Sequence, residues 1–395
     1  MISKNCRVCN SKNLKSVLSL GNQPLANNLE RYPIKSITYP LKLNVCLKCF
    51  NCQLSHVISS KKLFDNYLYQ SSVSKSFKKH FDDGSKKIIK LFKLKKKDYI
   101  LDVGSNDGIA LYPFKKRGFE NIIGIEPAKK LSNLTNRMGI KTYNIYLDSK
   151  FAVKNLGKYK IITASNVFAH VNNLSDFTKC VFKILKDDGV FIIEVQYIVK
   201  MLKEYSFDNI YHEHVNYWSL NTLKIFLSRF NFVIFNVEEV ETHGGSLRVY
   251  IKKIKNNNLK INKSVNVLLK KEKDLNINTL SIYNKLKIKV LSRKKKFLKF
   301  LKKIKKDNVN IVGYGAPAKA STLINYYKIY KYISYIIDDN PMKHRKYIPG
   351  TDLQILNKRK SKKIDYVIIF AWNYFNEIKK RNKGLSKRFI NIFQF

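Results

Sequence analysis

Short apolar runs alternate with helical stretches through the middle of the chain. Four runs have the length and the β-branched content of buried strands: residues 99–103, 121–125, 160–164 and 190–195. Between them, residues 174–185 have helical spacing and lead into the turn sequence Asp187-Asp188-Gly189. Strands that alternate with helices predict a parallel, doubly wound sheet. Two later runs, 232–237 and 247–251, are expected to close it.

The segments on either side of this sheet have other patterns. Residues 71–97 are polar and basic with apolar residues at helical spacing, which predicts a helix leading into the sheet. Residues 252–307 are rich in lysine and predict long connecting helices whose charged side chains are solvated. A second alternation follows, with strands at 309–312, 335–337 and 366–370 and a glycine-containing turn at 313–316. It predicts a second, smaller Rossmann-like α/β domain.

The cysteines of the first 70 residues occur in pairs. Cys6 and Cys9, and Cys46 and Cys49, form two C-x-x-C pairs with 36 residues between them. Four thiolates satisfy a structural zinc ion and leave no coordination position for water. Because Cys49-x-x-Cys52 also has this spacing, a second pairing is open; we favour Cys46 and Cys49. The expected parts are a zinc-binding domain (1–70), a sheet domain (71–255), a basic helical connector (256–307) and a C-terminal domain (308–395).

The glycine-rich turn after the first strand is the candidate cofactor site. The run Leu101-Asp102-Val103-Gly104-Ser105-Asn106-Asp107-Gly108 lacks the G-x-G-x-x-G spacing of dinucleotide sites. Its spacing is typical of the turn that binds S-adenosylmethionine (SAM), although a degenerate nucleotide-binding sheet is the alternative. Glu126 ends the next strand, where a carboxylate can accept hydrogen bonds from ribose hydroxyls. The predicted cofactor residues are Asp102, Gly104, Asn106, Asp107, Gly108, Glu126, Pro127, Ala164 and Asn166.

A dense group of titratable residues, Tyr211-His212-Glu213-His214, follows the fourth strand, where α/β sheets place their chemistry. Methylation of a carbon atom first requires loss of a proton, and a carbon next to a carbonyl group can lose one as an enolate. A histidine suits the base, with an unperturbed pKa of about 6.5, and a tyrosine can donate to the oxyanion. Glu213 can orient the imidazole, and His170 is a further pocket residue. A second zinc ion at this group is disfavoured, because adjacent positions seldom converge on one ion.

Two further motifs are candidates for substrate binding. The glycines of His243-Gly244-Gly245-Ser246 permit close approach of the backbone to a ligand, and Arg248 can meet a phosphate. A tight turn before a strand is the alternative explanation. Tyr67 and Tyr69 can either cap the active site or pack in the core.

The formal net charge is +48 over 395 residues. Such a balance suits an anionic partner, namely nucleic acid, a membrane face or a phosphate-bearing substrate. Lys, Asn, Ile and Tyr are frequent everywhere, however, and we favour compositional drift. Because no apolar run has the length of a membrane span and no secretory signal is present, we expect a cytoplasmic monomer without a membrane or nucleic-acid partner. An RNA methyltransferase that uses the basic surface and the zinc module is the alternative.

The chain resembles the three-domain sugar C-methyltransferases that act on nucleotide-linked keto sugars. Besides the cysteine pairs, the resemblance rests on motifs in a shared order over nearly the whole chain: 21–27 (GNQPLAN), 67–72 (YLYQSS), 102–108, 164–171, 211–214 (YHEH), 243–248 (HGGSLR), 313–319 (GYGAPAK) and 338–341 (DDNP). Phe50-Asn51-Cys52 and Ala320-Ser321 depart from the family pattern and leave local turn geometry open.

The resemblance implies methyl transfer from SAM to a carbon next to the keto group of a nucleotide-linked 4-keto-6-deoxy sugar. It implies that His214 is the base, assisted by Tyr211 and Glu213, and that Tyr69 and His170 lie near the sugar. It further implies that the zinc module and the C-terminal domain clamp the substrate over the central sheet. Gly315 and Lys319 would then meet phosphate at the start of a helix, beside His243, Gly244, Gly245 and Arg248 as substrate-binding residues.

Overall fold

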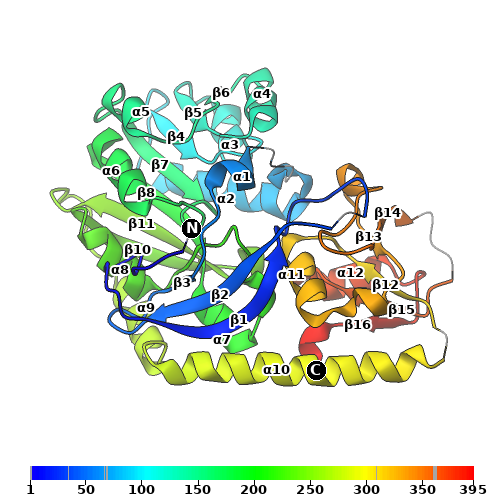
Figure 1. Cartoon of the computed structure of the whole chain (residues 1–395). Helices are drawn as coiled ribbons and strands as arrows, with labels where there is room; N and C mark the ends of the chain where they lie inside the picture. The colour runs from blue at the N-terminus through cyan, green and yellow to red at the C-terminus, as the bar shows by residue number, and fades with distance from the viewer. Residues whose placement is uncertain (1, 34, 66, 68–69, 308, 359–362) are drawn as a thin grey trace.

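Three β-sheets organise the molecule (Figure 1). The computed structural model describes the chain except for residues 1, 34, 66, 68–69, 308 and 359–362 and the side chain of His243. Tyr69, expected near the substrate, therefore lies outside the described residues. Among the helices that are described, none is both long and apolar enough to cross a membrane.

The N-terminal sheet is antiparallel and contains one strand from a distant part of the chain. Its strands, in spatial order, are β1 (Leu14–Pro24), β2 (Thr38–Cys46), β3 (Cys52–Leu54) and β9 (Asn216–Tyr217). β9 follows the central sheet's fifth parallel strand in sequence, so the zinc-side sheet and the central region share structure. None of these four strands was predicted from the sequence.

The central sheet has seven strands in the order β10-β11-β8-β7-β4-β5-β6. The strands from β8 to β6 are parallel, whereas β11 is antiparallel to both of its neighbours. Their bounds are β4 (Ile100–Val103), β5 (Ile122–Ile125), β6 (Lys141–Tyr143), β7 (Tyr159–Ser165), β8 (Leu185–Gln196), β10 (Phe232–Val240) and β11 (Ser246–Lys253). All six predicted strands are present. The expected turn at Asp187–Gly189 is wrong, because β8 begins at Leu185, which pairs with Tyr159.

Adjacent apolar residues in the parallel strands explain why both faces of the central sheet are covered. Ile100, Ile122 and Ile161 belong to one hydrophobic cluster, together with Ile88 of the predicted leading helix α2 (Lys75–Leu91). Their neighbours Leu101, Ile123 and Ile162 belong to the other cluster, because successive side chains of a strand point to opposite faces. The other helices of this region are α3 (Tyr112–Lys116), α4 (Lys129–Arg137), α5 (Ser149–Val153), α6 (Leu174–Ile184), α7 (Ile198–Glu204) and α8 (Leu220–Ser228).

The C-terminal sheet is entirely parallel, in the order β14-β13-β12-β15-β16. Its strands are β12 (Ile311–Tyr314), β13 (Ile336–Ile337), β14 (Ile355–Leu356), β15 (Tyr366–Ile369) and β16 (Arg388–Ile390), and its helices are α11 (Ala318–Tyr327) and α12 (Phe375–Arg381). Gly313 and Tyr314 lie in β12 rather than in the predicted turn, which starts at Gly315. The predicted second α/β unit is confirmed.

The lysine-rich segment forms α9 (Lys263–Asp274) and the long helix α10 (Leu280–Lys305), as predicted. α10 runs along one side of the molecule beneath the central and C-terminal regions (Figure 1). It contacts β1 and α7 as well as the short helices of the C-terminal region. Its buried residues include Tyr283, Leu286 and Phe297, so α10 packs an apolar side against the N-terminal, central and C-terminal regions.

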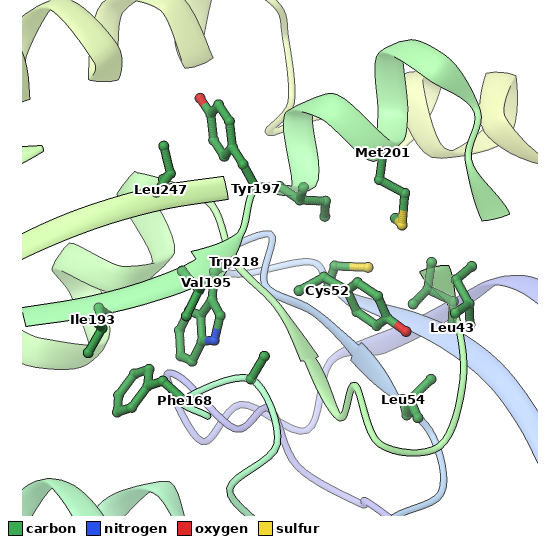
Figure 2. Close-up of a cluster of buried hydrophobic side chains, with 14 of the residues drawn as sticks. Leu43, Cys52, Leu54, Phe168, Ile193, Val195, Tyr197, Met201, Trp218 and Leu247 are labelled. Carbon is green, nitrogen blue, oxygen red and sulfur yellow. The ribbon is translucent and has the colours of Figure 1, made fainter. Parts of the chain in front are cut away.

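The core between the N-terminal and central sheets is continuous (Figure 2). Cys52 and Leu43 from the zinc side belong to the same hydrophobic cluster as Met201 and Trp218 of the central region, and all four are almost completely buried. Cys52 is therefore a core thiol, whereas the second cysteine pair is Cys46 and Cys49, as predicted.

Candidate active site

One large cavity lies where the carboxyl edges of the central and C-terminal sheets face each other. Its volume is about 980 Å³. The N-terminal, central and C-terminal regions all contribute to its walls, with Asn27, Gly104, Glu126, His214 and Lys319 among the lining residues. Because ligands of open α/β sheets bind at the carboxyl ends of strands, this cavity is the candidate active site.

The turn after β4 places its backbone close to the cavity. Gly104 has a φ of +70°, and a Cβ atom there would lie 2.4 Å from Cγ2 of Val167, so only glycine fits without movement. Gly104 and Asn106, two of the predicted cofactor residues, line the cavity. Asp107 and Gly108 do not line it; the Asp107 carboxylate instead accepts a 2.9 Å hydrogen bond from the Ser72 backbone amide.

The acid at the end of β5 is held by the same turn. The Glu126 carboxylate accepts hydrogen bonds from the backbone amides of Asn106 and Ala128, both at 2.8 Å, and lines the cavity beside Pro127. Burial raises the pKa of Glu126. Each oxygen has one further acceptor position, which fits a ribose hydroxyl of SAM.

Asp102 lies behind this surface. Its carboxyl accepts a 2.6 Å hydrogen bond from Thr163, and burial raises its pKa to about 7. Ala164 is fully buried, whereas Asn166 lines the cavity. Of the predicted cofactor residues, Asp102 and Ala164 therefore shape the wall without forming its surface.

Tyr211 and His214 form a hydrogen-bonded pair in the cavity wall. His214 Nδ1 is 2.9 Å from the Asn209 carbonyl oxygen, and Nε2 is 2.8 Å from the Tyr211 hydroxyl. Because a carbonyl oxygen only accepts, Nδ1 carries the proton and Nε2 is the basic nitrogen. The His170 ring lies 5.0 Å from the His214 ring, centroid to centroid. All three side chains line the cavity, as expected.

The two residues between this pair face the other way. Glu213 is buried and accepts a 2.7 Å hydrogen bond from Asn27 of the N-terminal region, and burial raises its pKa to about 8. His212 is buried near Tyr39, and burial lowers its pKa to about 4. The expectation that Glu213 orients the imidazole therefore needs correction, since the Asn209 carbonyl holds Nδ1.

Lys319 presents its ammonium group from the first turn of α11. Its Nζ atom lies 3.3 Å from Asn373 Oδ1 and 4.9 Å from the centre of the Trp372 ring. Burial lowers the pKa of Lys319, while Asp208 and Glu204 act in the opposite direction. Gly315 has a φ of +88° and does not line the cavity, although Lys319 does.

The described side chains and backbone around Gly244 lie beside the site without lining it. A Cβ atom at Gly244 would be 2.5 Å from Asn373 Nδ2, and one at Gly245 would be 2.5 Å from Lys200 Cγ, so both glycines serve close packing. The residue before them, His243, falls in the short helix Thr242–Gly244, and its side chain lies outside the described part of the structure.

Arg248 is not presented to the cavity, contrary to expectation. Its guanidinium is buried, 2.7 Å from the Glu194 carboxylate and 3.0 Å from His80 Nε2. Burial alone would raise the pKa of Glu194, but His80 and Arg248 hold it below its usual value. Because this group ties α2 to the central sheet, Arg248 has a structural partner where a phosphate was expected.

The four predicted zinc ligands converge. The sulfur atoms of Cys6, Cys9, Cys46 and Cys49 all lie within 4.8 Å of one another. The Cys6–Cys49 and Cys9–Cys46 Sγ distances are 3.5 Å and 3.6 Å. Tetrahedral ligands at a Zn–S distance of about 2.3 Å are separated by about 3.8 Å, so the cluster fits a structural zinc ion.

Three contributors to the site were not identified from the sequence. Asn27 and Asn373 reach the cavity from the N-terminal and C-terminal regions, and the Asn209 carbonyl determines the His214 tautomer. Asn27 lies in the 21–27 motif, which was a usable signal. A backbone carbonyl has no sequence signature, so the role of Asn209 was not accessible.

Three protein families match consecutive parts of the chain. A zinc binding domain matches residues 6–64, a methyltransferase domain matches 77–237, and a C-methyltransferase C-terminal domain matches 241–392. The C-methyltransferase NovU of Streptomyces niveus is 28% identical over 383 residues, which cover 94% of this chain and 90% of that protein.

Other relatives match a smaller part of the chain. The ubiquinone biosynthesis O-methyltransferase of Pelagibacter ubique is 28% identical over 141 residues, covering 33% of this chain and 57% of that protein. A crystal structure of a SAM-dependent methyltransferase from Clostridium acetobutylicum is 16% identical over 44% of this chain and 91% of its own, with a TM-score of 0.36. The domain order and the match along nearly the whole of a C-methyltransferase place this chain, a SAM-dependent methyltransferase with a zinc-binding domain, in the family of three-domain C-methyltransferases.

Proposed function

We propose that the enzyme methylates a carbon next to the keto group of a nucleotide-linked 4-keto-6-deoxy sugar. The observation that carries the proposal is the Tyr211–His214 pair with its basic Nε2. Both residues line the same cavity as the glycine-rich turn after β4, the candidate SAM site. An O-methyltransferase removes a proton from an acidic hydroxyl group. A carbon acid is weaker and needs both a base and an oxyanion donor.

Residues of this chain have separate roles in the reaction. His214 Nε2 takes the proton as the carbon–hydrogen bond breaks, and the electron pair moves toward the keto oxygen as an enolate. The Tyr211 hydroxyl transfers its hydrogen bond from Nε2 to that oxygen, which frees the nitrogen for the proton. His170 lies on the same wall beside His214. Bound SAM would supply the methyl group: the enolate carbon would form its new bond to that methyl as the methyl–sulfur bond breaks and S-adenosylhomocysteine leaves.

The substrate's nucleotide is assigned to the side of the cavity opposite the SAM turn. Lys319 and Asn373 line that side, and a partly buried ammonium at a helix start suits a pyrophosphate. Asn27 and Phe64 contribute from the zinc side. In this arrangement the zinc-binding and C-terminal domains hold the sugar over the central sheet.

The test is a methyl-transfer assay followed by mass spectrometry. The purified enzyme and SAM are offered dTDP-, GDP- and CDP-linked 4-keto-6-deoxy sugars, with tRNA and rRNA in parallel. We expect the enzyme to add one methyl group to a sugar. This methyl group should remain attached under conditions that cleave ethers, because it is bound to carbon. Methylated RNA with unchanged sugars would overturn the proposal.

A variant tests the assignment of the base. His214→Asn should lower turnover by about 10³-fold, the usual contribution of a general base, with SAM affinity unchanged. His56→Asn is the matched control, because His56 does not line the cavity, and it should retain activity. Full turnover by His214→Asn would refute His214 as the base.

A further inference from the structure

The segment that carries the catalytic pair is built with two opposite faces. Tyr211 and His214 line the cavity, whereas His212 and Glu213 are buried against the N-terminal region. The position of the base therefore depends on how this second face is held. A loop that carries catalytic groups needs such support, because small displacements of reacting atoms reduce the rate strongly.

The end of this segment is attached to the N-terminal sheet through its backbone. The Leu54 amide donates to the Val215 carbonyl at 3.1 Å, and β9 pairs with β3. The side-chain amides of Asn51 and Asn216 exchange two hydrogen bonds at 2.9 and 3.0 Å. These contacts fix residues 215–217, which follow the catalytic pair in sequence.

Asn27 makes the contact that lies next to the base itself. It follows β1 in the chain, after the buried residues Leu25 and Ala26, and its Nδ2 donates to Glu213 Oε2 at 2.7 Å. Glu213 is 2% exposed, so its carboxyl group depends on protein partners. Asn27 also lines the cavity, which places it between the substrate space and the buried acid.

We infer that Asn27 is a positioning residue that holds the Tyr211–His214 segment through Glu213, so that the zinc-binding domain acts directly on catalysis. The inference rests on the proposed function of His214. It assigns to the zinc-binding domain a defined mechanical contact with Glu213, the residue before the base and 186 residues away from Asn27 in sequence. Deleting this contact leaves a buried acid without its amide donor, and the segment then loses its attachment on the side nearest the base.

The electrostatics of Glu213 supply a readout that a general loss of stability does not change. Burial raises the pKa of Glu213 to about 8, and the hydrogen bond from Asn27 lowers it. Removing the donor therefore raises this pKa further. Any limb of the pH–rate profile that reports Glu213 must move to higher pH, whichever protonation state is active.

The experiment compares Asn27→Ala, Glu213→Gln and the double variant with the wild-type enzyme. Asn28→Ala is the matched control, because Asn28 is an exposed neighbour whose side-chain amide donates to Glu30 and not to the catalytic segment. Hydrogen exchange of the 209–217 amides and SAM affinity are measured without a sugar substrate. Turnover numbers, KM values and pH profiles are then measured with the sugar that the wild-type enzyme methylates.

We expect Asn27→Ala to speed exchange of the 209–217 amides about tenfold and to lower kcat by a similar factor, with SAM affinity unchanged. In the Glu213→Gln background, Asn27→Ala should add little, because residues that act through one contact are not additive. Unchanged exchange in Asn27→Ala, or an equal loss of kcat in both backgrounds with no shift of the pH profile, would overturn the inference. If the wild-type enzyme methylates no sugar, the proposed function fails, and the exchange arm still decides the role of Asn27.

Discussion

The turns after β4 and after β12 share one backbone frame and differ in the side chains placed on it. In the central sheet the Gly104 amide donates to the Ile125 carbonyl, and in the C-terminal sheet the Gly315 amide donates to the Ile337 carbonyl, both at 2.7 Å. Each glycine has a positive φ, +70° and +88°. The two sheets thus begin their first crossover with the same geometry.

The acid that follows each second strand also has the same role. Glu126 accepts from the Asn106 amide at 2.8 Å, and Asp338 accepts from the Ala316 amide at 2.7 Å. In both cases the acid secures the turn. Glu126 lines the cavity, whereas Asp338 does not.

The difference arises four residues after the first glycine of each turn. Gly108 occupies that position in the central sheet, and Lys319 occupies it in the C-terminal sheet. Two residues before the glycine, Asp102 in the first turn corresponds to Gly313 in the second. Neither Asp102 nor Gly108 lines the cavity, so the first turn presents its backbone and the neighbouring acid Glu126, whereas the second presents the Lys319 cation. A shared frame does not imply a shared ligand, and the side chains decide which partner each turn accepts.

The largest effect is expected on SAM affinity, which should respond to substitution of Glu126 but not of Asp338. Glu126→Gln should weaken SAM binding on the order of 100-fold, because hydrogen bonds to a charged acceptor contribute about 1.5–3 kcal/mol each. Asp338→Asn, the matched change in the other turn, should leave SAM affinity unchanged. Titration calorimetry measures both, and equal losses would show that the two turns do not have distinct ligands.

The next largest difference is expected between Gly104 and Gly315, in the loss of unfolding free energy on substitution. Gly104→Ala combines a positive φ with a 2.4 Å approach to Val167 and should reduce the free energy of unfolding by about 2 kcal/mol. At Gly315 the nearest atom would be Ala371 Cβ at 3.2 Å, so alanine should cost about 1 kcal/mol. Denaturant titration measures the free energy of unfolding of both variants. A larger loss for Gly315→Ala than for Gly104→Ala would contradict this expectation.

A smaller effect is expected for the cation. Lys319→Met should raise KM for the nucleotide sugar about tenfold, the cost of one charge-assisted contact, while SAM affinity stays constant. Lys331→Met, at an exposed position in the same region, is the control. A change of SAM affinity in Lys319→Met would contradict the separation of the two turns.

The smallest expected effect is on the pH dependence of the free energy of unfolding. Because burial raises the pKa of Asp102 to about 7 in the folded state, its contribution is fully present below its unfolded value and is lost as pH rises through 7. Between pH 5 and 6 the wild-type free energy of unfolding should fall by about 1 kcal/mol more than that of Asp102→Asn. Identical slopes of the free energy of unfolding against pH for the two proteins would show that the pKa of Asp102 is not raised.

The sequence alone determined the features that local geometry controls. Buried strands, the glycine turn with its following acid, the lysine-rich helices and the paired cysteines all follow from short-range spacing, and the structure contains each of them. The turn predicted at Asp187–Gly189 is absent, because pairing with β7 extends a strand through a sequence that favours a turn. Four strands of the N-terminal sheet were also missed: β1 and β2 are only partly buried, and β3 and β9 are buried but only three and two residues long.

Tertiary structure alone decided which groups meet. Glu194 and His80 engage Arg248 inside the protein, the Asn209 carbonyl selects the His214 tautomer, and Asn27 reaches Glu213 across 186 residues. No local period encodes these partners, because a buried polar group takes whichever donor or acceptor the packing of distant elements brings within about 3 Å. Residue types therefore indicated the chemistry, and the packing of three sheets around one cavity determined which residues face it.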